Sequence, residues 1–173
     1  FGTGGIFYTQ DIHFEEEMGN YYEKFYSESR IYLEKIIINY KNVLYLRINY
    51  PISSCSNPKN LLEKIKLYNK ISNSEISMTC VDTLFPLLST IIENKEIGIM
   101  NFVNPGTINL VDIKKKYNIV NNISDNYEVI DINYRPPIIL DTTRIEKYNP
   151  KNIIESIDQL LLKTIHNNIL LNE

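Results

Sequence analysis

Short apolar runs rich in β-branched residues alternate along this chain with helical segments. The runs "NVLYLRI" (42–48) and "IGIMNFV" (97–103) are typical of buried strands, and residues 25–40, with apolar side chains three and four apart, are typical of a helix. Further strands are expected at 1–8, 75–81 and 127–132, and further helices at 58–70, 82–95, 110–117 and 149–171. Such alternation predicts an α/β domain with a mainly parallel sheet.

Turn and cap residues set the expected helix starts. Asn57 and Pro58 are expected to open the second helix, Asp82 to cap the third, Thr107 or Asn109 to cap the fourth, and Pro150 to lie in the first turn of the last. Residues 9–24 are expected to form a long acidic loop. No repeat or composition break marks a second domain, so the 173 residues are interpreted as one domain.

Charge and cysteine content exclude several classes. The net charge of −3 gives no electrostatic case for nucleic acid or an anionic membrane, and no apolar run reaches the roughly 18 residues of a membrane span. Cys55 and Cys80 lack metal-ligand spacing and are expected to be free, buried thiols in a reducing compartment, which favours a cytoplasmic location. His13 and His166 are expected to be structural or solvated.

The stretch "FYSESR" (25–30) places Tyr26 four residues before Arg30. On a helix these two side chains share a face, and a cation there favours the phenolate, which would make Tyr26 a usable acid/base toward a carbonyl or alcohol. The alternative is an exposed tyrosine stacked on an arginine stem. Spacing alone leaves the two interpretations open.

Two other residues, Thr3 and Lys64, are candidate site residues, although each by itself has an ordinary structural explanation. Thr3 sits between glycines at the end of a strand and offers a hydroxyl to a substrate oxygen, or is simply a turn residue. Lys64 would be an acid/base if it faced a pocket, or is a solvated helix lysine. The segment "GTGG" (2–5) lacks the spacing of a phosphate-binding loop, and the abrupt opening on a strand suggests that the native N-terminus lies upstream.

Several segments in order resemble one family, the nucleotide-rhamnose synthase epimerase/reductases, related to the dTDP-4-dehydrorhamnose reductases within the extended short-chain dehydrogenase/reductases. They are "GTGGIF", "FYSESR", "NVLYLRINYPIS", "NPKNLLEKIKLY", "SMTCVDTLFPL", "GIMNFVNPG" and "YRPPIILDTTRIEKY". The match spans nearly the whole chain, and "LRINYPIS", "SMT" and "NFVNPG" are its most specific parts.

The resemblance implies a Rossmann-like doubly wound sheet that binds NADP(H), with NAD(H) as an alternative. It implies conversion of a UDP- or dTDP-4-keto-6-deoxyglucose to the nucleotide-L-rhamnose by epimerisation at C3 and C5 and reduction at C4. The resemblance leaves both a monomer and a homodimer open as the assembly of the protein. By this resemblance, Thr3 binds the C4 oxygen, Tyr26 protonates it, and Arg30 takes the place of a lysine that contacts the nicotinamide ribose.

The same resemblance assigns four more residues. Pro51 and Ile52 fall beside the nicotinamide, Lys64 matches a lysine implicated in the epimerisation, and Arg135 matches the substrate end of the site.

Departures from the family pattern bear on activity. Arg30 keeps the positive charge of the family lysine but is larger and forked. Gly5 stands where the family has a cysteine, the proposed proton-transfer partner of the lysine. Pro137 and Ile138 replace polar asparagines of the nearest relatives, although the reductase branch also has Arg-Pro there.

The glycine-rich strand–turn–helix that holds the cofactor pyrophosphate has no counterpart in this sequence. We therefore expect the chain to be the C-terminal part of an epimerase/reductase and to be inactive by itself. The alternative is a non-catalytic interaction protein, for which the family offers a precedent in the regulatory subunit of methionine adenosyltransferase.

Overall fold

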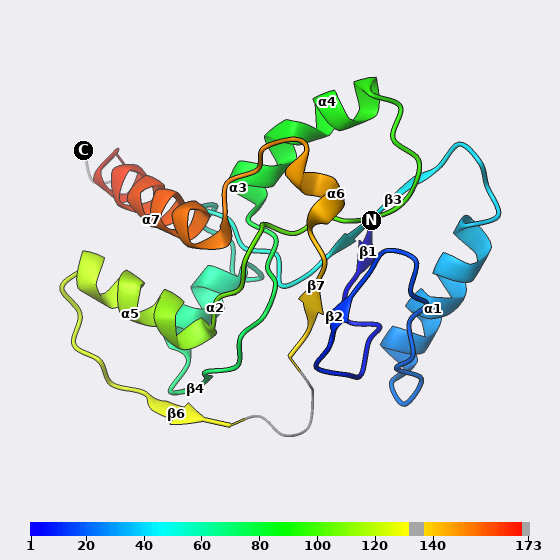
Figure 1. Ribbon diagram of the computed structural model, residues 1–173. Helices are drawn as coiled ribbons and strands as arrows, with labels where there is room; N and C mark the ends of the chain where they lie inside the picture. Colours follow the sequence, from blue (N-terminus) through cyan, green and yellow to red (C-terminus); the bar gives the residue numbers. More distant parts are fainter. Residues whose placement is uncertain (132–136, 171–173) are drawn as a thin grey trace.

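The computed structural model describes residues 1–131 and 137–170, with the side chains of the closing helix placed through residue 165 (Figure 1). The strands are β1 (Gly2–Thr3), β2 (Ile12–His13), β3 (Leu44–Ile48), β4 (Lys70–Ser72), β5 (Gly98–Asn101), β6 (Glu128–Ile130) and β7 (Ile139–Leu140). The helices are α1 (Phe25–Ile37), α2 (Leu61–Leu67), α3 (Val81–Leu84), the 3-10 turn η1 (Phe85–Leu87), α4 (Leu88–Glu93), α5 (Leu110–Val120), α6 (Thr143–Glu146) and α7 (Ile153–Leu170).

The main sheet has three strands in the order β1-β3-β5. Gly2 lies opposite Arg47, and Leu44 lies opposite Gly98. Two smaller pairs, β2 with β7 and β4 with β6, are parallel as well. The predicted α/β fold with parallel strands is therefore confirmed.

Helices cover both faces of this sheet. Leu46 of β3 and Met100 of β5 point to one face, where they join the buried cluster formed with Leu84 of α3 and Ile91 of α4. Helix α1 covers the opposite face, and Figure 1 shows α1 and α4 on the two sides of β3. A second core cluster joins α2, α5 and α7 at the far end of the molecule (Figure 1).

A charged cluster holds α6 against the strand β5. Glu96, which precedes β5, accepts hydrogen bonds from Lys147, from Arg144 at 2.5 Å and from the Tyr148 hydroxyl at 2.7 Å. These bonds hold the pKa of the Glu96 carboxyl at about 2. Arg144 also forms an ion pair with Glu15 at 3.1 Å, which brings the acidic loop into the same cluster.

The predicted helix 58–70 is too long at both ends. It begins after Asn60, not after Asn57, because the Asn60 side chain accepts the N–H of Leu62. It ends at Leu67, because the buried Lys114 of α5 donates to the carbonyls of Ile65 and Lys66 and so satisfies the last turn. The chain then extends into β4, which the sequence analysis missed.

The predicted strand 75–81 is wrong as a strand. This segment makes only isolated bridges, from Ile76 to Ile108 and from Ile52 to Cys80. The segment nevertheless lies in the core, because Ile76, Met78 and Cys80 are buried.

Two of the predicted helix starts are also wrong, the Asp82 cap and the place of Pro150 in a first turn. Asp82 lies inside α3, whose N-cap is Cys80, because its carboxylate instead accepts the N–H and hydroxyl of Ser54. Pro150 precedes the closing helix, which begins at Ile153. The Asn152 side chain accepts the N–H of Glu155 in the first turn of this helix. Asn109 caps α5, as predicted, by accepting the N–H of Asp112.

Candidate functional site

The candidate site lies beyond the carboxyl ends of β1 and β3, where α1 begins. Ligands of parallel α/β sheets bind at this edge. Thr3 is the last residue of β1 and pairs with Ile48, the last residue of β3. The Thr3 hydroxyl accepts the N–H of Gly5 at 3.0 Å, so its own proton stays available for a ligand.

Ser27 attaches the first turn of α1 to the Thr3 turn. Its buried hydroxyl donates to the Gly5 carbonyl at 2.7 Å. Because Tyr26 precedes Ser27, this bond ties the turn of α1 that carries Tyr26 to the turn that follows Thr3. Sequence reasoning missed Ser27, although its spacing from Ile31 and Glu34 puts it on the buried face of α1.

Tyr26 and Arg30 form a stacked pair on α1. The Arg30 guanidinium carbon lies 5.5 Å from the centroid of the Tyr26 ring, within cation–π range. Tyr26 is 54% exposed, as a residue on the surface of α1 would be. The stacking expected of a surface pair is therefore present, and the catalytic role of Tyr26 stays a prediction.

Behind this pair, the site is supported by a buried ion pair between β3 and α1. Arg47 and Glu34 are both fully buried and approach to 2.8 Å. The Arg47 guanidinium also donates to the carbonyls of Phe14, Glu15 and Glu17, which fixes the acidic loop to the sheet. The orientation of α1, and with it that of Tyr26, depends on this contact.

The residues assigned by resemblance beyond this pair have different surroundings. Pro51 is exposed just beyond β3, whereas Ile52 is fully buried and both its N–H and its carbonyl are bonded, to Thr79 and Val81. Lys64 is exposed on α2. Arg135 lies outside the described residues. Of the two residues expected beside the nicotinamide, Pro51 and Ile52, Pro51 has surface that a ligand could contact. The roles of Ile52 and Lys64 stay predictions.

Ile138 has a structural reason for its apolar character. It is fully buried in a cluster with Ile6, Phe7, Ile31, Val103 and Leu140. Its carbonyl accepts the N–H of Ser77. An asparagine here would be buried in an apolar cluster, so packing accounts for this departure from the family pattern. Pro137 is partly buried.

The histidines and cysteines considered in the sequence differ in their surroundings. His13 is buried, stacks on the Phe7 ring at 3.9 Å and bonds Glu17 through Nδ1. Cys80 is buried as predicted, but Cys55 is exposed because it lies in the loop before α2. The side chain of His166 lies outside the described part of the closing helix. Across the described residues, no group of His, Cys, Asp or Glu has the geometry of a metal site, and no helix is long and apolar enough to cross a membrane.

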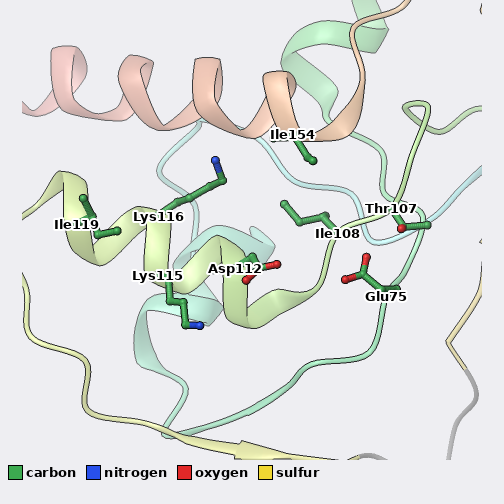
Figure 2. A pocket seen from close by; sticks show the side chains of 8 residues that line it. All are labelled: Glu75, Thr107, Ile108, Asp112, Lys115, Lys116, Ile119 and Ile154. Atoms are coloured by element: carbon green, nitrogen blue, oxygen red, sulfur yellow. The ribbon is translucent and has the colours of Figure 1, made fainter.

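A separate pocket of about 260 Å³ lies between α5 and the start of α7 (Figure 2). Ile108 and Ile154 face each other across it, while Glu75 and Asp112 lie at one side. The carboxylates of Glu75 and Asp112 both accept bonds from Asn109, and Lys116 pairs with Asp158. Because most of its charged rim is already paired, this pocket is a weaker candidate than the Tyr26 site.

Comparison with characterised proteins identifies relatives that match 68% and 87% of the chain, although no family model matches it. The chain is 37% identical over 126 residues to a trifunctional UDP-glucose 4,6-dehydratase/UDP-4-keto-6-deoxy-D-glucose 3,5-epimerase/UDP-4-keto-L-rhamnose-reductase of Arabidopsis thaliana, covering 68% of this chain and 19% of that protein. It is 31% identical over 160 residues to a bifunctional dTDP-4-dehydrorhamnose 3,5-epimerase/reductase of the same plant, covering 87% of this chain and 52% of that protein. The chain thus spans about half or less of the length of these relatives.

Solved structures agree. The L780 UDP-rhamnose synthase of Acanthamoeba polyphaga mimivirus superposes with a TM-score of 0.85 at 25% identity, over 92% of this chain and 62% of that one. A dTDP-4-dehydrorhamnose reductase of Bacillus anthracis, solved with NADP, gives 0.73 at 16% identity, over 94% of this chain and 64% of that one. In sequence and in Rossmann-like fold, the chain is therefore a relative of the nucleotide-rhamnose synthase epimerase/reductases and corresponds to part of their length.

Proposed function

We propose that this chain supplies the catalytic tyrosine of a nucleotide-sugar epimerase/reductase that converts a nucleotide-4-keto-6-deoxyglucose to a nucleotide-L-rhamnose. The observation that supports the proposal is the Ser27–Gly5 hydrogen bond, which ties the first turn of α1, where Tyr26 lies, to the turn that follows Thr3 at the carboxyl end of β1. This constellation occurs in a chain whose relatives carry both activities in their names.

The proposed reduction uses three side chains of this chain, and NADPH, when bound, would supply the hydride to C4 of the keto sugar. Tyr26 donates its phenolic proton to the C4 oxygen as negative charge develops there, and Thr3 donates a hydrogen bond to the same oxygen. Arg30, stacked on the Tyr26 ring, places a positive charge beside the phenolate that remains.

The residues at this edge fit a nicotinamide nucleotide. The Arg30 guanidinium makes no hydrogen bond with the described residues, so its N–H donors are available to ribose hydroxyls. Pro51 adds exposed apolar surface beyond β3. Because the sequence has no glycine-rich phosphate loop, we propose that a longer polypeptide holds the pyrophosphate and that the 173 residues alone do not turn over.

The test is NADPH consumption by the complete gene product with UDP- and dTDP-4-keto-6-deoxyglucose. Tyr26→Phe should lower kcat by about 10²- to 10⁴-fold, the usual contribution of a general acid. Tyr32→Phe, a half-exposed tyrosine on the same helix, is the matched control and should retain activity. A fully active Tyr26→Phe variant would exclude Tyr26 as the acid.

A second candidate function, a non-catalytic interaction protein, is favoured by two substitutions. Arg30 replaces the family lysine, and Gly5 leaves no side chain at the family cysteine. If the complete wild-type protein consumes no NADPH and Arg30→Lys gains no activity, the catalytic proposal fails and this second function is preferred.

A further inference from the structure

Tyr50, just beyond the end of β3 and directly before Pro51, has a strained backbone. Its φ of 39° lies in the left-handed region, which a residue with a side chain adopts only at a cost in free energy. This conformation is further disfavoured because a residue that precedes a proline prefers extended backbone. Such an outlier persists only where its surroundings hold it, and outliers of this kind gather at functional sites.

Thr79, which is fully buried, bonds the residues on both sides of this bend. Its N–H donates to the Asn49 carbonyl at 2.8 Å, and its carbonyl accepts the N–H of Ile52 at 3.0 Å. Its hydroxyl accepts the N–H of Asn49 at 3.1 Å and donates to the Phe102 carbonyl at 2.7 Å. The bend between Asn49 and Ile52 is therefore fixed at both ends by one residue.

The hydroxyl of Thr79 also joins the bend to the neighbouring strand. Asn49 follows the last residue of β3 and Phe102 follows the last residue of β5, so one hydroxyl connects the carboxyl ends of two paired strands. Asn49 is held through its side chain as well, whose amide donates to the Ser77 carbonyl at 2.8 Å. The place of Pro51, which is exposed at this edge of the sheet, therefore depends on contacts with the segment that carries Thr79.

We propose that Thr79 is a positioning residue for the nicotinamide cofactor: it keeps Tyr50 in the left-handed conformation and thereby places Pro51 where it would meet the nicotinamide. This role deepens the proposed function and rests on it, whereas the bend and its hydrogen bonds do not. Extended backbone at Tyr50 would carry Pro51 elsewhere. The larger the share of molecules in that extended conformation, the weaker the binding of the cofactor, in proportion.

The strained bend is tested by urea unfolding of two variants of the complete gene product, Tyr50→Gly and Tyr50→Ala. Both lose the tyrosine side chain, so the difference between them reports the backbone. Tyr50→Gly should have an unfolding constant about tenfold lower than Tyr50→Ala, because glycine adopts a positive φ without penalty. Tyr68, with a φ of −72°, is the matched control, and Tyr68→Gly should be no more stable than Tyr68→Ala. A Tyr50→Ala variant as stable as Tyr50→Gly would overturn the proposal.

The role toward the cofactor is tested by titrating the complete gene product with NADPH and following its fluorescence, which gives Kd without turnover. Thr79→Val should raise Kd by about tenfold, because losing the hydrogen bonds of the hydroxyl shifts the bend away from the binding conformation by about that factor. Thr79→Ser keeps the hydroxyl and should stay within about threefold of wild type. Thr83→Val is the matched control: the Thr83 hydroxyl bonds Ser156 of α7 at 2.9 Å, so its loss should lower stability and leave Kd unchanged.

The Tyr50 variants supply a second measurement of cofactor binding, which decides the proposal even if Thr79→Val does not fold. Tyr50→Gly should bind NADPH more tightly than Tyr50→Ala, by up to about tenfold, because more of its molecules adopt the bend. An NADPH Kd that is equal in wild type and Thr79→Val, or equal in the two Tyr50 variants, would overturn the role of Thr79. If wild type binds no NADPH, the proposed function fails and this role fails with it, and the unfolding comparison still decides the bend.

Discussion

The Arg30 guanidinium lies over the ring of Tyr26, one helical turn away on the same face of α1. In the proposed reduction it is the charge of this group that stabilises the phenolate, so Arg30→Lys should keep kcat/KM within about tenfold of wild type, a difference of about 1.4 kcal/mol. Arg30→Met, which keeps bulk and removes the charge, should lower it by about 10²-fold. Steady-state NADPH consumption by the complete protein measures both.

The control for this series is Lys35→Met, which removes a cation stacked on Tyr22 and Tyr32 farther along α1. It should leave the kinetics unchanged. Equal activity of Arg30→Met and wild type would show that the charge at position 30 plays no part in the reduction.

Ser27→Ala should destabilise the protein by about 1–3 kcal/mol, because it leaves the Gly5 carbonyl without its hydrogen bond. Urea unfolding measures the change. Ser29→Ala is the matched control, since the Ser29 hydroxyl is exposed and bonds only the carbonyl of Tyr26 in its own helix. Equal midpoints for the two variants would mean that Ser27 does not anchor α1.

Glu34→Ala should lower the free energy of unfolding by about 3–5 kcal/mol, because it leaves the Arg47 guanidinium buried without its carboxylate. The exposed pair Lys70–Glu128, at 3.0 Å, is the internal comparison, and Glu128→Ala should unfold close to wild type. Chemical denaturation of both variants at one pH makes the comparison. Similar losses would contradict the assigned difference in burial.

Glu96 should make stability depend on pH in the acid range. Its pKa is lowered from 4.5 to about 2 by Lys147, Arg144 and Tyr148, so its contribution is full above pH 4.5 and is lost as pH falls toward 2. Glu96→Gln should therefore lower the free energy of unfolding most near neutral pH, and the loss should shrink progressively below pH 4.5. Urea midpoints of both proteins across this range measure the difference. A cost that stays constant with pH would rule out this linkage.

Epimerisation should be impaired separately from reduction. Gly5 has no side chain to carry a proton, so solvent deuterium should enter C3 and C5 of the keto sugar slowly in the wild-type protein. Gly5→Cys should speed this exchange, and the gain should disappear when Lys64→Met is added. Rapid exchange in wild type would show that another residue supplies the second proton.

Local patterns in the sequence predicted the helices, strands and caps that depend on residues close together in the chain. The helix at 25–37, the strands at 44–48 and 98–101 and the Asn109 cap follow from periodicity and from side chains within one turn. The Tyr26–Arg30 stacking also follows from i,i+4 spacing. The family resemblance, carried by motifs spread along the chain, predicted the fold.

Interactions between distant segments were not predictable in this way. Asp82 looks like a cap, but Ser54, 28 residues away, takes both of its oxygens. Helix α2 ends where Lys114 reaches its last carbonyls, 48 and 49 residues along the chain. The hydrogen-bond partner of Ser27 is likewise a carbonyl 22 residues earlier, which helix spacing does not reveal. Tertiary contacts overrode local preference at each of these positions.

Glu15 joins three parts of the molecule at once. Its carbonyl receives Arg47 of β3, one carboxylate oxygen receives the N–H of Asn101 on β5, and the other pairs with Arg144 of α6. The acidic loop therefore links β3, β5 and α6 to one another and is itself held in place by them. Although it has little regular structure, it should tolerate insertions as poorly as a core strand does, and a change in its length should be felt at the Glu34 and Glu96 clusters together.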